Sequence, residues 1–379
     1  MRQLLDYQAD QIELVLRTHR VTGQVVGGIV TPRWIRYQLR LDLTARVVTV
    51  IKLSEEIALR LGVGTVRISR HGPTIHVEVP RQDPQSVYLM QLCDQLAEVP
   101  KQSTLLGMDE EGLPLLLRLP SPEVAHVLIA GTTGSGKTAL AQSMALSLAM
   151  HNRLGEVQML LIDPKGEGFG PLDGLPHLLR PVVREVHHAI FLLGELVEEM
   201  VRRDRSGISE PRVVVFIDEV ADLIDQGGNA ISRLLTRLTQ RGRGAGIHII
   251  ACTQKPLAAS IGSITRSNFP VRLVGSVASA DDAKVAAGVG GTGAEKLLGR
   301  GDFLLITKGQ VIRFQAAYVN RQQIYRLIGQ LQDSQRQGRR WLAEESPIAL
   351  AATGTDSLRD EKPRSRLRML FGTQLRLLR

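Results

Sequence analysis

A glycine-rich turn between an apolar run and a helical pattern carries the residues with the clearest chemistry. Residues 127–138 are Val-Leu-Ile-Ala-Gly-Thr-Thr-Gly-Ser-Gly-Lys-Thr, and a strand, a loop and a helix in this order form the context of a phosphate-binding loop. The glycines let the backbone curve closely around an anion, which side chains would obstruct. The free N–H groups and the dipole of the following helix favour negative charge at the same place. The segment therefore predicts a binding site for a nucleoside triphosphate.

Each residue of this loop has an expected role in holding ATP and Mg²⁺. Lys137 should contact the β- and γ-phosphates, and the Thr138 hydroxyl should ligate Mg²⁺. The remaining positions should wrap the phosphates with their backbone, and they are Gly131, Thr132, Thr133, Gly134, Ser135 and Gly136. The alternative is a glycine turn that matches the pattern by chance. The strand before the turn and the helix after it argue against that alternative.

Two acidic residues follow a second apolar run. Residues 213–219 are Val-Val-Val-Phe-Ile-Asp-Glu, and such a run suits a central parallel strand covered by helices on both faces. Ligands of open α/β sheets bind at the carboxyl ends of such strands. There Asp218 is expected to be the outer-shell partner of Mg²⁺, and Glu219 to orient and deprotonate the attacking water. A solvated acidic cap is the alternative, but Asp222 and Asp225 add like charge that calls for a cation.

The order of the predicted elements indicates the fold class. Apolar strands are predicted at 157–162, 213–217, 247–252 and 271–274, with helical patterns between them. Strands that alternate with helices indicate a doubly wound, mainly parallel sheet. Residues 121–320 are therefore expected to form an α/β, RecA-like P-loop NTPase domain, which would catalyse in-line hydrolysis of the γ-phosphate.

Three further segments flank this predicted domain. Residues 1–100 are expected to form a small α/β domain that opens with a helix, and Ser54 is predicted to cap a second, short helix. Residues 101–120 form a connector with a hairpin that turns through residues 109–112. Residues 321–379 are predicted to hold one amphipathic helix and then a basic, disordered tail.

Composition restricts the class of protein and its partners. The chain has 379 residues, of which 43% are hydrophobic, and this suffices for two domains. Its net charge of +9 favours a polyanionic partner, and residues 320–379, with 12 Lys/Arg and 6 Asp/Glu, account for +6 of it. The aromatic content of 4% argues against recognition of nucleic acid by rows of stacked aromatic side chains.

Cysteine content and apolar runs bear on the location of the protein. Cys93 and Cys252 lie in apolar sequence and are interpreted as buried thiols, which indicates a reduced, cytosolic location by default. The first residues lack the apolar segment of a signal peptide. No run reaches the about 18 apolar residues that a membrane span needs. The chain is therefore expected to be cytoplasmic, without direct insertion into a membrane.

Four other polar residues have competing interpretations. His177 and His248 lie among apolar neighbours without a metal-ligand spacing, so packed or hydrogen-bonded histidines are favoured over catalytic ones. Asp163 and Lys165 follow the predicted strand 157–162. They would either couple the state of the nucleotide to other loops or form a local ion pair.

Five more short segments occur along the chain, in addition to the glycine-rich turn and the apolar run that ends in Asp218 and Glu219. They are Leu161-Ile-Asp-Pro-Lys165 with Gly174-Leu-Pro-His-Leu-Leu179, Arg237-Leu-Thr-Gln-Arg-Gly-Arg-Gly-Ala-Gly-Ile-His248, Thr253-Gln254-Lys255-Pro256, Asn268-Phe-Pro-Val-Arg272 and Leu297-Leu-Gly-Arg-Gly-Asp302. Together the seven segments resemble the FtsK/SpoIIIE family of DNA translocases, within the wider FtsK–HerA class of hexameric motors. The first hundred residues are similar, more weakly, to the small N-terminal motor subdomain of that family. The chain is expected to lack the membrane segments and the C-terminal winged-helix module of family members.

The resemblance implies a ring of six subunits around duplex DNA, with ATP bound between neighbours. The resemblance assigns to Thr253 and Gln254 the role of a polar sensor near the γ-phosphate. It assigns the trans-acting arginine finger to Arg243, which would stabilise transition-state charge in a neighbour's site. The alternative for Arg243 is a solvated basic helix end. Where the family has a second trans-acting lysine, this chain has Ala280, and Lys284 lies one turn further on.

The leading functional hypothesis is a ring-shaped homohexameric motor that translocates double-stranded DNA without sequence preference, at the expense of ATP. The main alternative is a coupling or secretion ATPase with a protein or nucleoprotein cargo, and a third is a DNA-binding regulator that assembles without moving. The basic C-terminal tail is expected to add affinity for DNA or to contact a recruiting protein. ATP hydrolysis stimulated by duplex DNA would favour the first hypothesis over the second. Displacement of a triplex strand would separate the first from the third.

Overall fold

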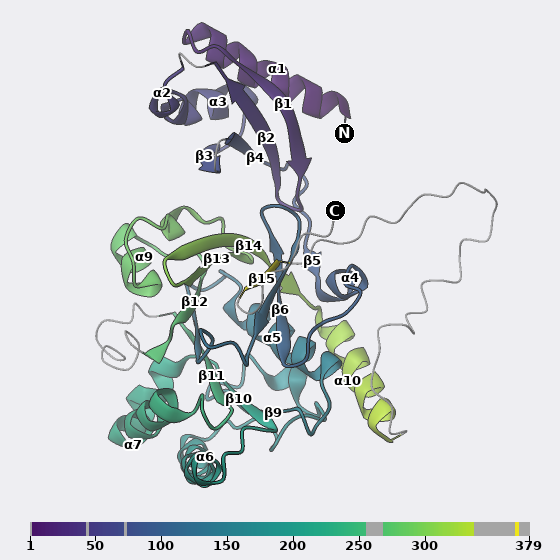
Figure 1. The fold of residues 1–379 in the computed structure, drawn as a ribbon, viewed down its shortest axis with the longest axis vertical. Helices are drawn as coiled ribbons and strands as arrows, with labels where there is room; N and C mark the ends of the chain where they lie inside the picture. The colour runs from purple at the N-terminus through teal and green to yellow at the C-terminus, as the bar shows by residue number, and fades with distance from the viewer. Residues whose placement is uncertain (1, 43–44, 72–73, 255–267, 337–367, 371–379) are drawn as a thin grey trace, which may run out of the picture. The chain divides into compact units, whose positions relative to one another are not determined.

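The chain divides into two compact units, Met1–Ser86 and Val87–Arg379 (Figure 1). The structure is a computed structural model, and it describes residues 2–42, 45–71, 74–254, 268–336 and 368–370.

The smaller unit combines a four-stranded antiparallel sheet with three helices. Its elements are α1 (Arg2–Thr18), β1 (Gly23–Val30), β2 (Trp34–Leu41), α2 (Val47–Lys52), α3 (Ser54–Leu61), β3 (Arg67–His71) and β4 (Thr74–Pro80). The strands lie in the order β1-β2-β4-β3. Alternating residues of β2 and β4, such as Tyr37 and Val77, pack against Ile12 and Leu16 of α1 in one core. This unit has the predicted small α/β architecture, but it ends at Ser86 and not at residue 100, because residues 87–100 belong to the larger unit.

One detail of this unit differs from the sequence-based expectation. Ser54 is the first helical residue of α3 and does not cap it. Leu53 occupies the cap position, and its side chain makes no capping hydrogen bond. The helix is supported at its start by Glu55 and Glu56, whose charges favour the positive end of the helix dipole.

The larger unit is built around one large mixed sheet. Its strands are β5 (Val87–Tyr88), β6 (Ser103–Asp109), β7 (Pro114–Arg118), β8 (Val127–Ala130), β9 (Val157–Ile162), β10 (Arg212–Ile217), β11 (Ile247–Thr253), β12 (Val271–Val274), β13 (Asp302–Thr307), β14 (Gln310–Tyr318) and β15 (Arg368–Leu370). Its α-helices are α4 (Leu89–Asp94), α5 (Lys137–His151), α6 (Val186–Ser206), α7 (Val220–Arg241), α9 (Ala280–Ala287) and α10 (Arg321–Arg336), and two 3₁₀ helices span Gly170–Leu172 and Ala294–Lys296.

Five strands of this sheet form its parallel part, in the order β12-β8-β11-β10-β9. These strands confirm the predicted doubly wound parallel sheet. The sheet continues beyond β12 through the antiparallel strands β13, β14, β6 and β7, and β15 lies parallel to β7. The hairpin predicted in the segment 101–120 is β6–β7, and it is part of this sheet.

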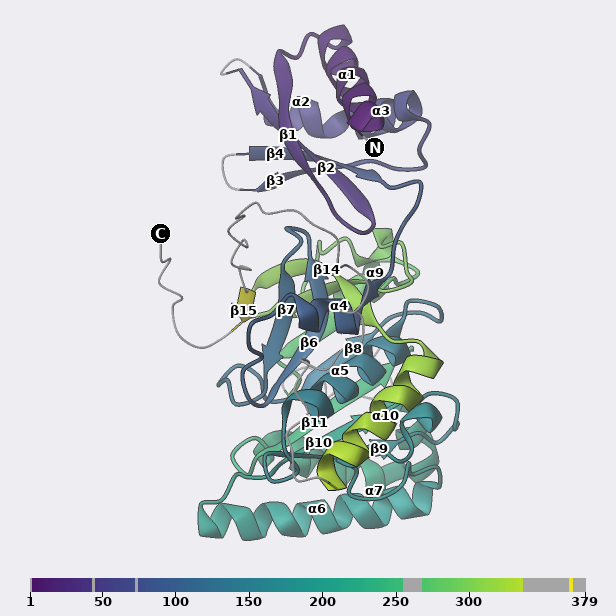
Figure 2. The ribbon, with the colours of Figure 1, turned by 90° about the vertical axis from the view of Figure 1, so that its right-hand side faces the viewer.

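Different helices cover the two faces of the parallel strands, with α5 and α10 on one side and α6 and α7 on the other (Figure 2). Alternate residues of β10 face the two cores. Val214 and Phe216 pack in the core with α5, whereas Val215 and Ile217 pack in the core with α6 and α7. Because both faces are buried, the strand is apolar throughout.

The last sixty residues are described in part. The predicted amphipathic helix is α10, which buries Ile324, Leu327 and Leu331. The predicted basic tail lies outside the described residues, except for β15. No helix in the described part of the chain has both the length and the apolar character that a bilayer crossing requires.

Candidate nucleotide-binding site

The glycine-rich loop of residues 131–136 connects the end of β8 to the start of α5, as predicted. Three of its glycines have a positive φ angle, namely Gly131 (153°), Gly134 (81°) and Gly136 (102°). Residues with a side chain rarely adopt such angles. A Cβ atom on Gly136 would also lie only 2.9 Å from the backbone nitrogen of Gly301. The loop therefore depends on its glycines both for its dihedral angles and for its close packing.

Backbone hydrogen bonds from neighbouring segments hold the loop in place. The Thr132 N–H donates to the carbonyl of Ser276 at 2.8 Å, just after β12. The Gly301 N–H donates to the carbonyl of Ser135 at 2.7 Å, just before β13. The loop is thus fixed by two segments that lie more than one hundred residues further along the chain.

The Lys137 ammonium lies within the curve of the loop. The side chain is buried, with 7% exposed, and Nζ donates to the carbonyls of Gly131 at 2.9 Å and Thr132 at 3.0 Å. Burial lowers the pKa of Lys137, and the charges of Glu219 and Asp218 act in the opposite direction. A cation that is held in this way is placed to meet the phosphates of a nucleotide.

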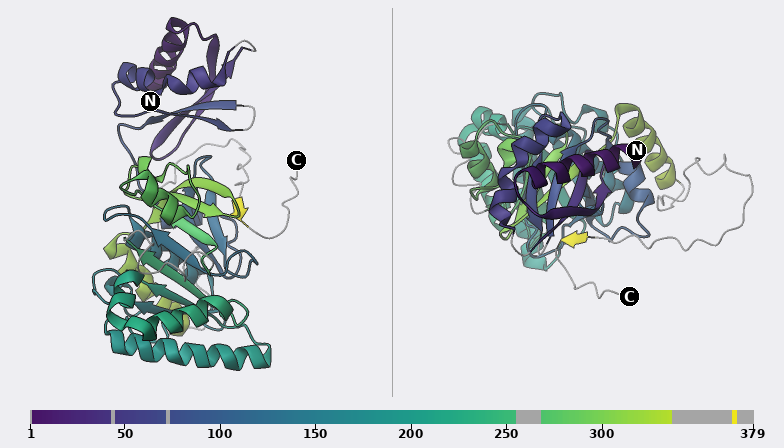
Figure 3. Two further views of the ribbon diagram at one scale, coloured as in Figure 1. Left: turned by 90° about the vertical axis from the view of Figure 1, so that its left-hand side faces the viewer. Right: turned by 90° about the horizontal axis from the view of Figure 1, so that it is seen from above.

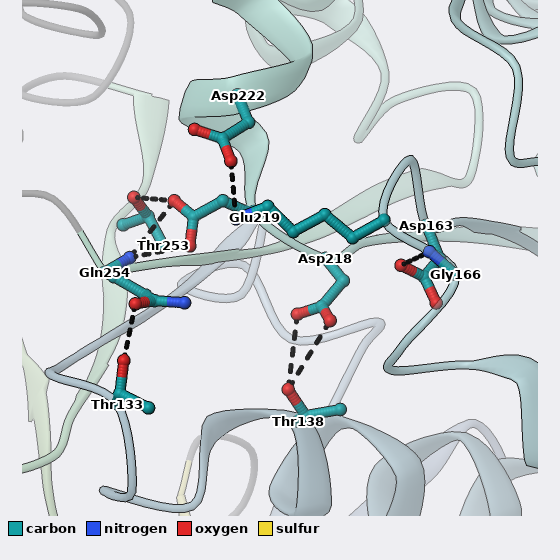
Figure 4. Close-up of polar contacts among 10 residues, drawn as sticks. Thr133, Thr138, Asp163, Gly166, Asp218, Glu219, Asp222, Thr253 and Gln254 are labelled. Atoms are coloured by element: carbon teal, nitrogen blue, oxygen red, sulfur yellow. Dashed lines mark hydrogen bonds and ion pairs between the residues drawn. The ribbon is translucent and has the colours of Figure 1, made fainter.

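Thr138 and Asp218 face each other between the start of α5 and the end of β10 (Figure 4). The Thr138 Oγ1 lies 3.4 and 3.5 Å from the two carboxylate oxygens of Asp218. Burial, together with the charges of Asp163 and Glu219, raises the pKa of Asp218 to about 6. This concentration of negative charge would be relieved by a divalent cation.

These two side chains fit a magnesium ion of the kind that accompanies ATP. Within the described residues, no group of three or more His, Cys, Asp or Glu side chains could hold a metal ion. When the protein supplies only one hydroxyl and one carboxylate, water and phosphate oxygens fill most of the coordination positions of the ion. Magnesium is usually held in this way in nucleotide sites.

The Asp163 carboxylate organises the loop that follows β9. It is fully buried and accepts hydrogen bonds from the N–H groups of Gly166 (2.9 Å), Gly168 (2.8 Å) and Phe169 (2.8 Å). Lys165 forms its ion pair with Asp222 at 2.6 Å. The two residues therefore have different partners, and Asp163 brings a second carboxylate close to Asp218.

Glu219 has an unusual backbone conformation at the start of α7. Its φ and ψ angles are 55° and 67°, in the left-handed region, where a residue other than glycine is strained by about 1–3 kcal/mol. Its buried carboxylate accepts hydrogen bonds from Thr253 Oγ1 at 3.1 Å and from the Gln254 N–H at 3.1 Å. Such strain concentrates at functional sites. Here the strained backbone directs the Glu219 carboxylate toward the end of β11.

Gln254 connects the acidic residues to the glycine-rich loop. Its side-chain oxygen accepts a hydrogen bond of 2.7 Å from Thr133 Oγ1, while its backbone N–H contacts Glu219 (Figure 4). The structure thus brings together the loop, the residues proposed for Mg²⁺, and Glu219 with its neighbours on β11. Lys255 and Pro256, which belong to the same sequence motif, lie outside the described residues.

Arg243 does not belong to this group of residues. It is exposed and precedes β11, whereas Thr253 and Gln254 lie at the far end of that strand. Seven strand residues at about 3.3 Å each separate the two ends by about 20 Å. Ala280 is the first residue of α9, and both Ala280 and Lys284 are exposed.

Two histidines, His177 and His248, and both cysteines have the structural roles predicted for them. Nε2 of His177 lies 2.9 Å from the carbonyl of Asn152, and Nδ1 of His248 lies 2.8 Å from the carbonyl of Ala125. Burial lowers the pKa of His177 and lowers that of His248 to about 3. Cys93 and Cys252 are free and buried, and burial raises the pKa of the Cys93 thiol to about 12.

Models of known protein families match most of the smaller unit and a little more than half of the larger one. The model described as the FtsK/SpoIIIE family matches residues 97–206 and 204–258, and that of the FtsK alpha domain matches residues 2–81. The chain belongs to the FtsK/SpoIIIE family. The predicted resemblance is thereby confirmed.

Curated relatives at 30–34% identity carry the name DNA translocase FtsK. The protein from Leptospira interrogans is 34% identical over 355 residues, which cover 85% of this chain and 37% of the relative. The protein from Sporosarcina ureae is 30% identical over 394 residues, which cover 94% of this chain and 50% of the relative. The chain thus spans half of the length of these relatives or less.

Solved structures of ATPases share the fold at lower sequence identity. The pCW3 conjugation coupling protein TcpA, in its monomer form with ATPγS, has a TM-score of 0.60 and 19% identity, and the match covers 87% of this chain and 99% of that one. The cytoplasmic domain of the type VII secretion ATPase EccC of Thermomonospora curvata has a TM-score of 0.54 and 22% identity, with 63% and 32% covered. These similarities confirm the predicted P-loop NTPase fold.

Proposed function

We propose that the chain hydrolyses Mg²⁺-bound ATP and uses the energy to translocate double-stranded DNA without sequence preference. Membership of the FtsK/SpoIIIE family and the relatives named DNA translocase support this proposal. The ATPase part rests on one observation. The side chains of Lys137, Thr138, Asp218 and Glu219 lie close together beside the glycine-rich loop. The net charge of +9 suits a polyanionic partner.

Each residue of the site would have its own role in ATP hydrolysis. The loop backbone and Lys137 would hold the β- and γ-phosphates, and Thr138 and Asp218 would hold Mg²⁺. The bound magnesium ion neutralises charge that develops on the phosphate oxygens. Glu219 would orient the attacking water and accept its proton. Thr253 and the Gln254 backbone would fix the direction of the Glu219 carboxylate through the contacts described above.

We further propose that the ATP site is completed by the next subunit of a homohexameric ring. Arg243 lies about 20 Å from its own nucleotide loop, as judged from the length of β11. It is also exposed, so its guanidinium is available to another subunit. An arginine that reaches the γ-phosphate from a neighbour stabilises transition-state charge. The site residues and Arg243 would then meet only at an interface between subunits.

Triplex displacement on purified protein tests this function most directly. We expect ATP-dependent release of a third strand from duplex DNA, together with ATP hydrolysis that duplex DNA stimulates. The Lys137→Ala protein is the negative control for both measurements. Stimulation without displacement would support a DNA-binding regulator. ATPase activity that is indifferent to duplex DNA would support a coupling or secretion ATPase with another cargo.

A further inference from the structure

The loop that carries Arg243 is intrinsically flexible, yet its proposed task requires a fixed position. It runs from the end of α7 to the start of β11 over residues 242–246, and three of these five residues are glycines, namely Gly242, Gly244 and Gly246. Glycine loses more conformational entropy on ordering than any other residue. An arginine finger contributes to catalysis only when its guanidinium is held where charge develops. The loop makes two backbone hydrogen bonds of its own, from the Gly246 N–H to the carbonyl of Arg243 at 3.1 Å and from the Ile247 N–H to the carbonyl of Gly242 at 2.8 Å. Contacts from outside the loop add to this order.

Arg203, in the last turns of α6, makes such contacts. The side chain is buried, with 4% exposed. Its Nη1 donates to the carbonyl of Ala245, in the loop, at 3.1 Å and to the carbonyl of Pro211 at 2.7 Å. Its Nε donates to Glu199, one turn earlier on α6, at 2.7 Å. One guanidinium thus joins the loop of Arg243 to α6 and to the segment before β10.

A second contact ties the same part of α6 to the base of the loop. Arg241, the last residue of α7, donates from Nη2 to the carboxylate of Asp204 at 2.8 Å. The loop also packs closely against the segment that follows α6, since a Cβ atom on Gly246 would lie only 2.0 Å from the carbonyl oxygen of Ser209. The long helix α6 runs beside α7 along this side of the larger unit (Figure 3). Its last two turns therefore support the loop.

We propose that Arg203 is a positioning residue for Arg243, because it holds the loop from which Arg243 would reach a neighbour's γ-phosphate. This proposal rests on the proposed function, in which Arg243 acts in trans. The geometry requires an arginine, since the planar guanidinium can serve two carbonyls and a carboxylate at once. A lysine ammonium at the same place is a compact point charge that cannot span all three acceptors.

Removal of this guanidinium takes a donor from the carbonyls of Ala245 and Pro211 but leaves the Glu199 carboxylate paired. Glu199 also accepts hydrogen bonds from Arg202 at 2.7 and 2.6 Å. The contacts with Arg202 and Arg203 lower the pKa of Glu199 to about 2, so the carboxylate stays ionised near neutral pH. In Arg203→Met, Glu199 therefore keeps one cationic partner and the apolar stem at position 203 is retained. Arg205→Met is the matched control, because Arg205 is exposed on the same helix.

Steady-state ATPase kinetics in the presence of duplex DNA give the first measurement. We expect Arg203→Met to lower kcat roughly 10- to 100-fold, because small displacements of a catalytic group have effects of this size. The affinity for ATP should stay near that of the original protein, since the nucleotide loop lies at the other end of β11. Arg205→Met should leave both quantities unchanged. An unchanged kcat in Arg203→Met, with Arg243→Ala impaired, would overturn the positioning role and leave the proposed function intact.

A double-mutant cycle separates positioning from a merely structural role. If Arg203 acts only through Arg243, Arg203→Met should cause no further loss of kcat in an Arg243→Ala background. An additional loss of similar size in that background would contradict the proposal. An unchanged kcat in Arg243→Ala itself would instead overturn the trans finger of the proposed function. Should Arg203→Met fail to fold, the same cycle applies to Arg203→Lys, which keeps the stem and the positive charge.

Discussion

Asp218 is proposed to help hold Mg²⁺, and we predict that its replacement stabilises the protein when no nucleotide is bound. Burial and the carboxylates of Asp163 and Glu219 raise the pKa of Asp218 to about 6, from an ordinary value of 3.8. The folded protein therefore holds the Asp218 proton more tightly than the unfolded chain does. Stability is lost as the pH rises between these two values, and the loss is complete above about pH 6. Asp218→Asn should remove this loss.

The size of the effect follows from the difference in pKa. A pKa difference of about two units corresponds to a free energy of unfolding of roughly 3 kcal/mol, which is an upper bound for a buried carboxylate. Asp218 is only partly buried, and screening by water should reduce the penalty to about 1 kcal/mol. For a unit of this size, that free energy corresponds to a rise in Tm of about 2–4 °C. The rise should be present at pH 7.5 and should shrink as the pH is lowered toward 4.

Calorimetry on the protein without nucleotide or Mg²⁺ can check this prediction. Glu198→Gln is the control, because it removes an exposed carboxylate of α6. Addition of Mg²⁺ and ATPγS should stabilise the original protein more than Asp218→Asn, since the variant lacks the carboxylate that would hold the ion. A lower Tm in Asp218→Asn at pH 7.5 would refute the reasoning. It would mean that Asp218 contributes a favourable interaction that outweighs its desolvation.

Three further predictions concern catalysis and DNA binding. Glu219→Gln should bind ATP but lose steady-state hydrolysis, and near-normal turnover would contradict its role as the base. Arg243→Ala mixed with Lys137→Ala should regain ATPase activity in co-assembled rings, because an intact loop can then face an intact Arg243; no recovery would argue against action in trans. Truncation after residue 340 should lower the slope of log affinity for duplex DNA against log salt by about 0.9 per lost phosphate contact, whereas an unchanged slope would assign the tail to a protein partner.

The parts of the site that could be predicted are those encoded by neighbouring residues. The glycine-rich loop, with Lys137 and Thr138 after it, forms its own turn between β8 and α5. Asp218 and Glu219 likewise follow directly from the apolar run of β10. In a parallel sheet the carboxyl ends of the strands meet at one edge, so two local motifs were enough to place these groups near each other.

The parts that could not be predicted depend on contacts between distant segments. The hairpin β6–β7 joins the sheet through β14, which lies about 200 residues further along the chain. Both faces of β6 are buried, so it lacks the polar alternation that marks a half-exposed strand. Asp163 is a similar case, because its role depends on the path that the backbone takes through Gly166 and Gly168. The support of the Arg243 loop by Arg203 arises only when α6 packs beside α7.

The opposite locations of the nucleotide loop and Arg243 restrict how subunits could assemble under the proposed function. Each subunit offers its nucleotide site at the carboxyl ends of the parallel strands and Arg243 before the amino end of β11. In a two-fold symmetric pair, residue i contacts residue j and residue j contacts residue i through one interface, so such a pair joins the two surfaces only where one face of the subunit presents both. A head-to-tail contact joins them at every interface, and it closes into a ring when the rotation between subunits permits. A catalytic arginine at this position therefore fits a head-to-tail ring, in which the nucleotide site of each subunit meets Arg243 of its neighbour.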